Sequence, residues 1–66
     1  MDKYYIVHEK NHSVVRPGFD SMTMAALNIP SVCKLIHAYD ETIKQSDFDV
    51  RLMSLDDIKR FEQEKS

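Results

Sequence analysis

The start of the chain has the hydrophobic pattern of β-structure. Positions 3–9 are rich in aromatic and β-branched residues, whose side chains alternate between the two faces of a strand. Turn-forming residues at 10–13 and a short apolar segment at 14–16 then predict a β-hairpin. We expect Pro17 and Gly18 to end this hairpin, because proline cannot donate a hydrogen bond to a β-ladder.

Two helical patterns follow, on either side of a proline. Asp20 or Ser21 is placed to cap a helix over 22–28. Pro30 breaks or kinks this pattern, because the residue before a proline is pushed away from helical angles. A second helix is predicted at about 32–45, from apolar residues at the spacing i, i+3, i+4, i+7 and i+11. These residues are Val32, Leu35, Ile36, Tyr39 and Ile43.

The last third of the chain predicts one more strand and one more helix. Apolar and polar residues alternate strictly over 47–53, which is typical of a strand with one polar face. Ser54 and Asp57 then have the spacing of a capping box, the signature of a helix start. The predicted buried side of this helix consists of Leu55, Ile58 and Phe61.

The predicted order is therefore β-β-α-α-β-α, in a single small α+β domain over 1–66 with a frayed end at 63–66. We expect a three-stranded antiparallel sheet, in which the later strand pairs beside the N-terminal hairpin. Two to three helices would cover one face of this sheet. A domain of this size has a thin core, which a homodimer would enlarge.

Composition and charge narrow the classes of function. Nine Lys and Arg residues stand against eleven Asp and Glu residues, so the net charge of −2 does not favour non-specific binding of nucleic acid. The single cysteine cannot form an internal disulfide, which indicates a reducing, cytoplasmic setting. The longest apolar run, 24–27, is too short for a membrane span, and the N-terminal residues do not resemble a signal peptide.

The residues that could carry chemistry do not form a specific motif. Cys33, His37 and Asp40 are legitimate zinc ligands at helical spacing, but a zinc site requires a fourth ligand that no second pair supplies. A nucleophilic role for Cys33 would need a substrate pocket that a chain this short can hardly build. With one glycine, the chain has no phosphate-binding or dinucleotide-binding loop. We therefore predict a non-enzymatic protein with no cofactor, no metal and no catalytic residue.

Two binding surfaces are predicted instead. The leading hypothesis is an acidic face that meets a basic surface of a partner protein. This face would contain Asp47, Asp49, Asp56, Asp57 and Glu62. The alternative is a single-stranded DNA surface on the hairpin, where bases would stack on tyrosines beside cations. That surface would contain Lys3, Tyr4, Tyr5, Lys10, His12 and Arg16.

Five segments along nearly the whole chain also form a pattern shared with a known family. They are Tyr5-Ile6-Val7, Lys10, Pro17-Gly18-Phe19, Ala25-Ala26 and Asp47-Phe48-Asp49-Val50-Arg51-Leu52. In this order they resemble the small nonstructural protein of gokushovirus-type microviruses. The resemblance implies a phage accessory protein that is linked to single-stranded DNA replication and works in the cytoplasm of the host cell.

Overall fold

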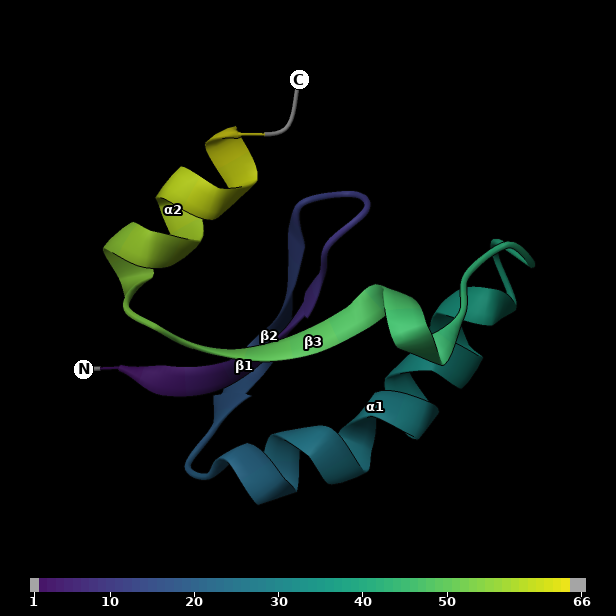
Figure 1. The fold of residues 1–66 in the computed structure, drawn as a ribbon, viewed down its shortest axis with the longest axis horizontal. Coiled ribbons are helices and arrows are strands. Elements are labelled where there is room, and N and C mark those ends of the chain that lie inside the picture. The colour runs from purple at the N-terminus through teal and green to yellow at the C-terminus, as the bar shows by residue number, and fades with distance from the viewer. Residues whose placement is uncertain (1, 65–66) are drawn as a thin grey trace.

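The fold is built on a three-stranded antiparallel sheet, as the alternating patterns predict. The computed structural model describes residues 2–64. Its strands are β1 (Lys3–His8), β2 (Ser13–Phe19) and β3 (Phe48–Met53), in the spatial order β2-β1-β3 (Figure 1). The central strand β1 pairs antiparallel with both neighbours. The prediction that the later strand pairs beside the hairpin is thus confirmed.

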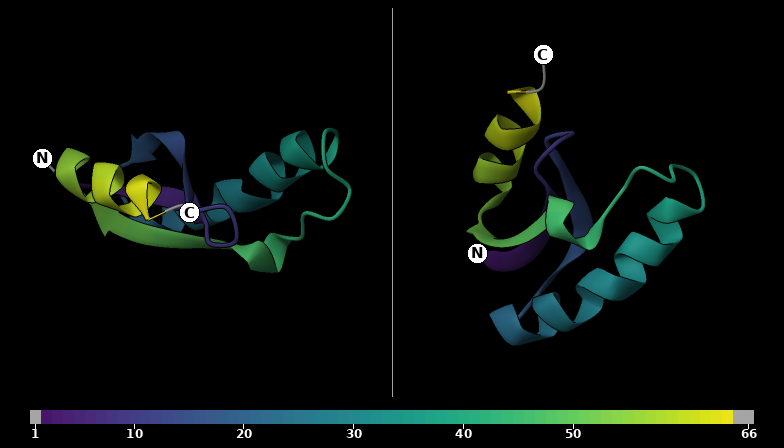
Figure 2. Two further views of the ribbon diagram at one scale, coloured as in Figure 1. Left: turned by 90° about the horizontal axis from the view of Figure 1, so that it is seen from above. Right: turned by 45° about the vertical axis from the view of Figure 1, so that its right-hand side comes forward.

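The two helices lie on opposite faces of this sheet, so the prediction that all helices share one face is wrong (Figures 1 and 2). Ile6 of β1 packs in a cluster with α1 (Met22–His37), whereas the adjacent Val7 packs in another cluster with α2 (Leu55–Gln63). Both side chains are fully buried. Because successive side chains of a strand point to opposite faces, apolar residues at both positions need a cover on each side.

Strand β2 continues through Pro17 and Gly18 to Phe19, so the prediction that these residues end the hairpin is wrong. β2 is an edge strand, and its register with β1 shifts opposite this segment, which is where a proline can be accommodated. Gly18 lies against the ring of Tyr5: a Cβ atom here would stand 2.8 Å from the Cζ atom of that tyrosine. The close approach of ring and backbone therefore requires glycine.

Helix α1 runs without a break through Pro30, so the predicted second helix after this proline does not exist. Of the two predicted caps, Ser21 is the one that serves, because its Oγ accepts a hydrogen bond of 3.1 Å from the backbone N–H of Met24. Pro30 is exposed and cannot donate to the carbonyl of Ala26. The packing of one continuous apolar stripe on the sheet outweighs this lost hydrogen bond.

Helix α1 ends at His37, well before the predicted end at 45. The backbone N–H groups of Tyr39 and Asp40 both donate to the carbonyl of Ile36, and a turn follows in which Asp40 accepts hydrogen bonds from Thr42. Val32 and Ile36 pack on the sheet as predicted and Ile43 is buried outside the helix, whereas Leu35 and Tyr39 are exposed.

The predicted capping box at the start of α2 is confirmed. Ser54 Oγ accepts a hydrogen bond from the N–H of Asp57, and Asp57 Oδ2 accepts one from the N–H of Ser54. Ile58 and Phe61 are buried as predicted, but Leu55 is 71% exposed. Leu55 lies two residues beyond Met53, the last paired residue of β3, and therefore beyond the end of the sheet.

This capping box should make the start of α2 sensitive to acid. Hydrogen bonds with the backbone and hydroxyl of Ser54 hold the pKa of Asp57 below its ordinary value of 3.8. A lowered pKa in the folded state means that the carboxylate stabilises the fold above pH 3.8, and that this contribution disappears as the pH falls through the folded-state pKa. We expect Asp57→Ala to lower the melting temperature at neutral pH. As the pH falls, the melting temperature of this variant should decrease less than that of the native chain.

Circular dichroism melts across the acidic range measure this effect. Asp56→Ala is the matched control, since Asp56 lies in the same first turn but outside the capping box. Its melting temperature should follow the native pH profile. Parallel profiles for Asp57→Ala and the native chain would show that the capping carboxylate does not govern the acid response.

Candidate interaction surface

The structure does not gather the five acidic residues of the leading hypothesis on one surface. Asp47 precedes β3, whereas Asp56 and Asp57 follow it, so these two groups are separated by the length of a six-residue strand, roughly 20 Å. In chain order the five residues are Asp47, Asp49, Asp56, Asp57 and Glu62.

Most of these acids already have partners within the chain. Asp47 Oδ2 accepts a hydrogen bond from the N–H of Lys44, and Asp49 Oδ1 accepts one from the N–H of Val50. Asp57 binds Ser54 and also lies 3.1 Å from Arg60, while Glu62 lies 3.0 Å from Arg16. Two of the five acids, Asp57 and Glu62, are therefore already paired with arginines of the same chain.

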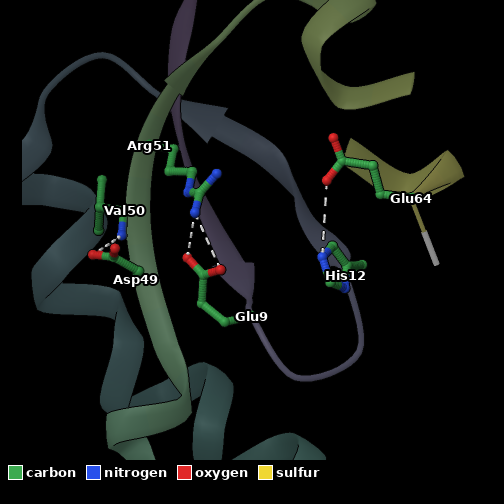
Figure 3. Close-up of polar contacts among 6 residues, drawn as sticks. All are labelled: Glu9, His12, Asp49, Val50, Arg51 and Glu64. Atoms are coloured by element: carbon green, nitrogen blue, oxygen red, sulfur yellow. Dashed lines mark hydrogen bonds and ion pairs between the residues drawn. The ribbon is translucent and has the colours of Figure 1, made fainter. Parts of the chain in front are cut away.

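The hairpin residues of the DNA alternative are distributed in a similar way. Lys3 lies 3.5 Å from Asp20, and Arg16 pairs with Glu62. His12 lies 3.9 Å from Glu64, an ion pair when the imidazole is protonated (Figure 3). These three basic side chains thus face acids across the fold, which leaves less net positive charge for phosphate groups.

The two tyrosines of the hairpin do not form a common stacking platform. Tyr4 packs against the α1 side of the sheet and Tyr5 against the α2 side, and both are half-buried. Lys10 is exposed in the turn between β1 and β2, which also contains His12. A continuous aromatic and basic surface is therefore missing from the hairpin among the residues that the structure describes.

An open depression of about 300 Å³ lies between β3 and α2. Its two arginines are both engaged: Arg51 Nη2 donates to the two carboxylate oxygens of Glu9 at 2.8 and 3.1 Å, and Arg60 pairs with Asp57 (Figure 3). The guanidinium of Arg51 also lies 5.1 Å from the centre of the Phe61 ring, a cation–π distance. Arg51 thus links β3 to the hairpin turn and to α2, and each of the two arginines already has an acidic partner.

The residues considered as zinc ligands do not converge. Cys33 is buried on the sheet side of α1, His37 Nδ1 lies 3.4 Å from the carbonyl of Ile43, and Asp40 binds Thr42. Hydrogen bonds from Thr42 hold the pKa of Asp40 below its ordinary value. Within residues 2–64, no group of three or more His, Cys, Asp or Glu side chains is arranged to hold a metal ion.

The feature that sequence reasoning missed is the outer face of α1, which we define as Met24, Leu27 and Leu35. Leu27 is 71% exposed and Leu35 is 70% exposed, and Met24 is exposed as well. The opposite side of the helix packs on the sheet through Ala25 and Cys33. α1 is thus apolar on both sides, which is typical of a helix that is covered by further protein.

The residue types along α1 strengthen this interpretation. Its sixteen residues include no aspartate or glutamate, and the only cationic or titratable basic side chains are Lys34 and His37 in the last turns. Helical spacing alone puts Met24 on the side of the helix away from Ala25 and Ile29, but a break at Pro30 would separate it from Leu35. Only a continuous helix aligns the three apolar side chains on one face.

No helix in the described part is both long enough and apolar enough to cross a membrane. Comparison of the chain with protein-family models, with curated proteins and with solved structures finds no match.

Proposed function

We propose that this chain is a non-enzymatic binding module that engages another protein through the outer face of α1. The observation that carries the proposal is the exposure of Leu27 and Leu35 on a helix whose other side is already packed on the sheet. Covering a leucine side chain contributes about 1.5–3 kcal/mol. A partner that covers both leucines therefore gains a substantial part of the binding free energy of a micromolar complex.

The chemistry of α1 also indicates what the partner presents. An amphipathic or apolar helix binds in a hydrophobic groove through side chains at helical spacing, as Met24, Leu27 and Leu35 are placed. Lys34 and His37 near the end of the helix favour acidic groups at that end of the groove. The resemblance to microvirus nonstructural proteins supports a phage accessory role, in which this partner would be a protein of the infected cell.

A photo-crosslinking residue at position 27 tests this proposal in a lysate of the cells in which the protein occurs. We expect one dominant crosslinked partner, absent when the same residue replaces Lys59, which is exposed on α2. With that partner purified, Leu27→Glu together with Leu35→Glu should weaken binding roughly a hundredfold or more, since two buried leucines are lost. Lys59→Glu should bind as the native chain does.

The DNA alternative is tested in parallel by fluorescence anisotropy with single-stranded DNA at low and high salt. We expect no salt-sensitive binding, because the hairpin cations Lys3 and Arg16 face acids. Binding that weakens as salt rises, and that Tyr5→Ala with Lys10→Ala removes, would replace the proposed function by the DNA-binding alternative.

A further inference from the structure

Strand β3 forms an open edge of the sheet. The strand order leaves β2 and β3 at the two edges, and in Figure 1 β3 lies in front of the other strands with neither helix crossing it. The β2 edge contains Pro17 and an irregular register, both of which obstruct the addition of another strand. β3 contains neither proline nor glycine.

The hydrogen-bond pattern shows which backbone groups of β3 face outward. The N–H of Glu9 donates to the carbonyl of Asp47 at 3.1 Å, just beyond the pair of His8 with Phe48. Hydrogen-bonded pairs alternate along an antiparallel ladder, so the N–H and C=O groups of Val50 point away from β1. Asp49 Oδ1 accepts this N–H at 2.8 Å, in agreement with an outward direction (Figure 3).

The side chains along this edge are complementary to those of a second copy of the same strand. An antiparallel pairing centred on Val50 places each Asp49 opposite Arg51 of the other copy, on the α2 side of the sheet. On the α1 side it places each Phe48 opposite Leu52 of the other copy. Both sets match: opposite charges directly across from one another, and apolar residues across from apolar residues, stabilise strand pairs.

We infer that two copies of this chain associate through β3 and form a continuous six-stranded antiparallel sheet. The N–H of Val50 passes from Asp49 to the carbonyl of Val50 in the second copy, and each Asp49 is released to bind Arg51 across the junction. This association uses a surface other than the outer face of α1, so it goes beyond the proposed function.

The present contacts of the edge residues are compatible with this pairing. Both hydrogen bonds from Arg51 to Glu9 come from Nη2, and a guanidinium has further donors for Asp49 of the second copy. The N–H of Phe48 already donates to the carbonyl of Gln45 and is not available to the second copy. The N–H groups of Val50 and Leu52 in each chain remain, so the junction contains about four backbone hydrogen bonds. An interface of this size is at the small end of specific interfaces, so the dimer should dissociate on dilution.

Analytical ultracentrifugation of the full chain over a range of concentrations measures this association. We expect the mass of two chains at high concentration and of one chain on dilution. Asp49→Arg places two arginines opposite each other at both symmetric pairs, so it should weaken the dimer roughly tenfold or more. Arg51→Asp places two aspartates there and should have the same effect.

The decisive measurement mixes these two variants. In a mixture of Asp49→Arg chains with Arg51→Asp chains, every cross-junction pair again combines opposite charges. A heterodimer should therefore form at a concentration at which each variant alone is monomeric. Asp56→Arg is the matched control: the same change of charge on α2, outside the paired strand, should leave the native dimer intact. Circular dichroism confirms that each variant is folded.

Leu52→Pro gives an independent test that does not depend on charge. The N–H of Leu52 faces away from β1 and its side chain is exposed, so proline removes a junction hydrogen bond while the monomer retains its fold. The inference is overturned if the native chain stays monomeric at all concentrations, or if its dimer survives both Asp49→Arg and Leu52→Pro. A dimer that Leu27→Glu abolishes and Asp49→Arg leaves unchanged would place self-association on α1 instead.

Discussion

Ile58→Ala is expected to destabilise the fold by about 2–5 kcal/mol, the largest effect of any substitution that we predict. Ile58 is only 2% exposed and lies in the cluster that joins α2 to Val7 of the central strand. Truncating it removes buried apolar surface and leaves a cavity that the well-packed neighbours fill only in part. Because a domain this small has a thin stability margin, the variant should be largely unfolded at physiological temperature.

Urea unfolding followed by circular dichroism measures this loss as a lower midpoint at an unchanged slope. Leu55→Ala is the matched control, because Leu55 lies on the same helix at 71% exposure and should change stability by no more than about 0.5 kcal/mol. If Ile58→Ala does not fold, Ile58→Val still gives a graded loss of about 0.5–1.5 kcal/mol. Equal losses at positions 55 and 58 would contradict the packing of α2 on the second face of the sheet.

Pro30→Ala is expected to stabilise the fold by about 2 kcal/mol. Proline in a helix interior is about 3 kcal/mol less favourable than alanine, because it lacks the N–H and its ring meets the preceding turn. The gain is reduced by about 0.4–1 kcal/mol, since proline also restricts the unfolded chain. Pro30 is exposed, so its replacement sacrifices little packing and restores a donor for the carbonyl of Ala26.

The same urea titration measures this gain, with Lys34→Ala as the control at an exposed position of α1. Both lysine and alanine are good helix formers, so this control should shift the stability by only a few tenths of a kcal/mol. A loss of stability in Pro30→Ala would mean that the proline ring at this position is needed for α1 to pack on the sheet. Dilute protein should be used, so that association does not contribute to the measured stability.

Local patterns in the sequence were sufficient to predict the order and the type of most helices and strands. The alternation in β1 and β3 predicted the two paired strands, and Ser54 with Asp57 predicted the start of α2 to the residue. Such patterns depend on backbone geometry within a few residues, which is why they can be recognised without the fold. Continuous apolar character in β1, from Tyr4 to Val7, also contained the signal that both sheet faces are covered, although the prediction placed the helices on one face.

The candidate surface was predictable only in part. Helical spacing alone puts Met24 on the side of the helix away from Ala25 and Ile29, but its exposure and its alignment with Leu35 require that α1 continue through Pro30. Local preference at proline favours a break, and packing of the inner stripe on the sheet overrides this preference. The open edge of β3 likewise depends on which strands pair, a choice that no local pattern in the chain determines.

The charged residues show most clearly which features depend on the sequence alone and which depend on the tertiary structure. The sequence by itself determined how many acids and cations there are, and that Ser54 and Asp57 cap a helix, because capping joins residues three apart. Only the tertiary structure decided that Arg16 meets Glu62, 46 residues away, and that Arg51 meets Glu9, 42 residues away. Such pairs depend on strand register and on the face that α2 covers, and these follow from burying both sides of β1 at once.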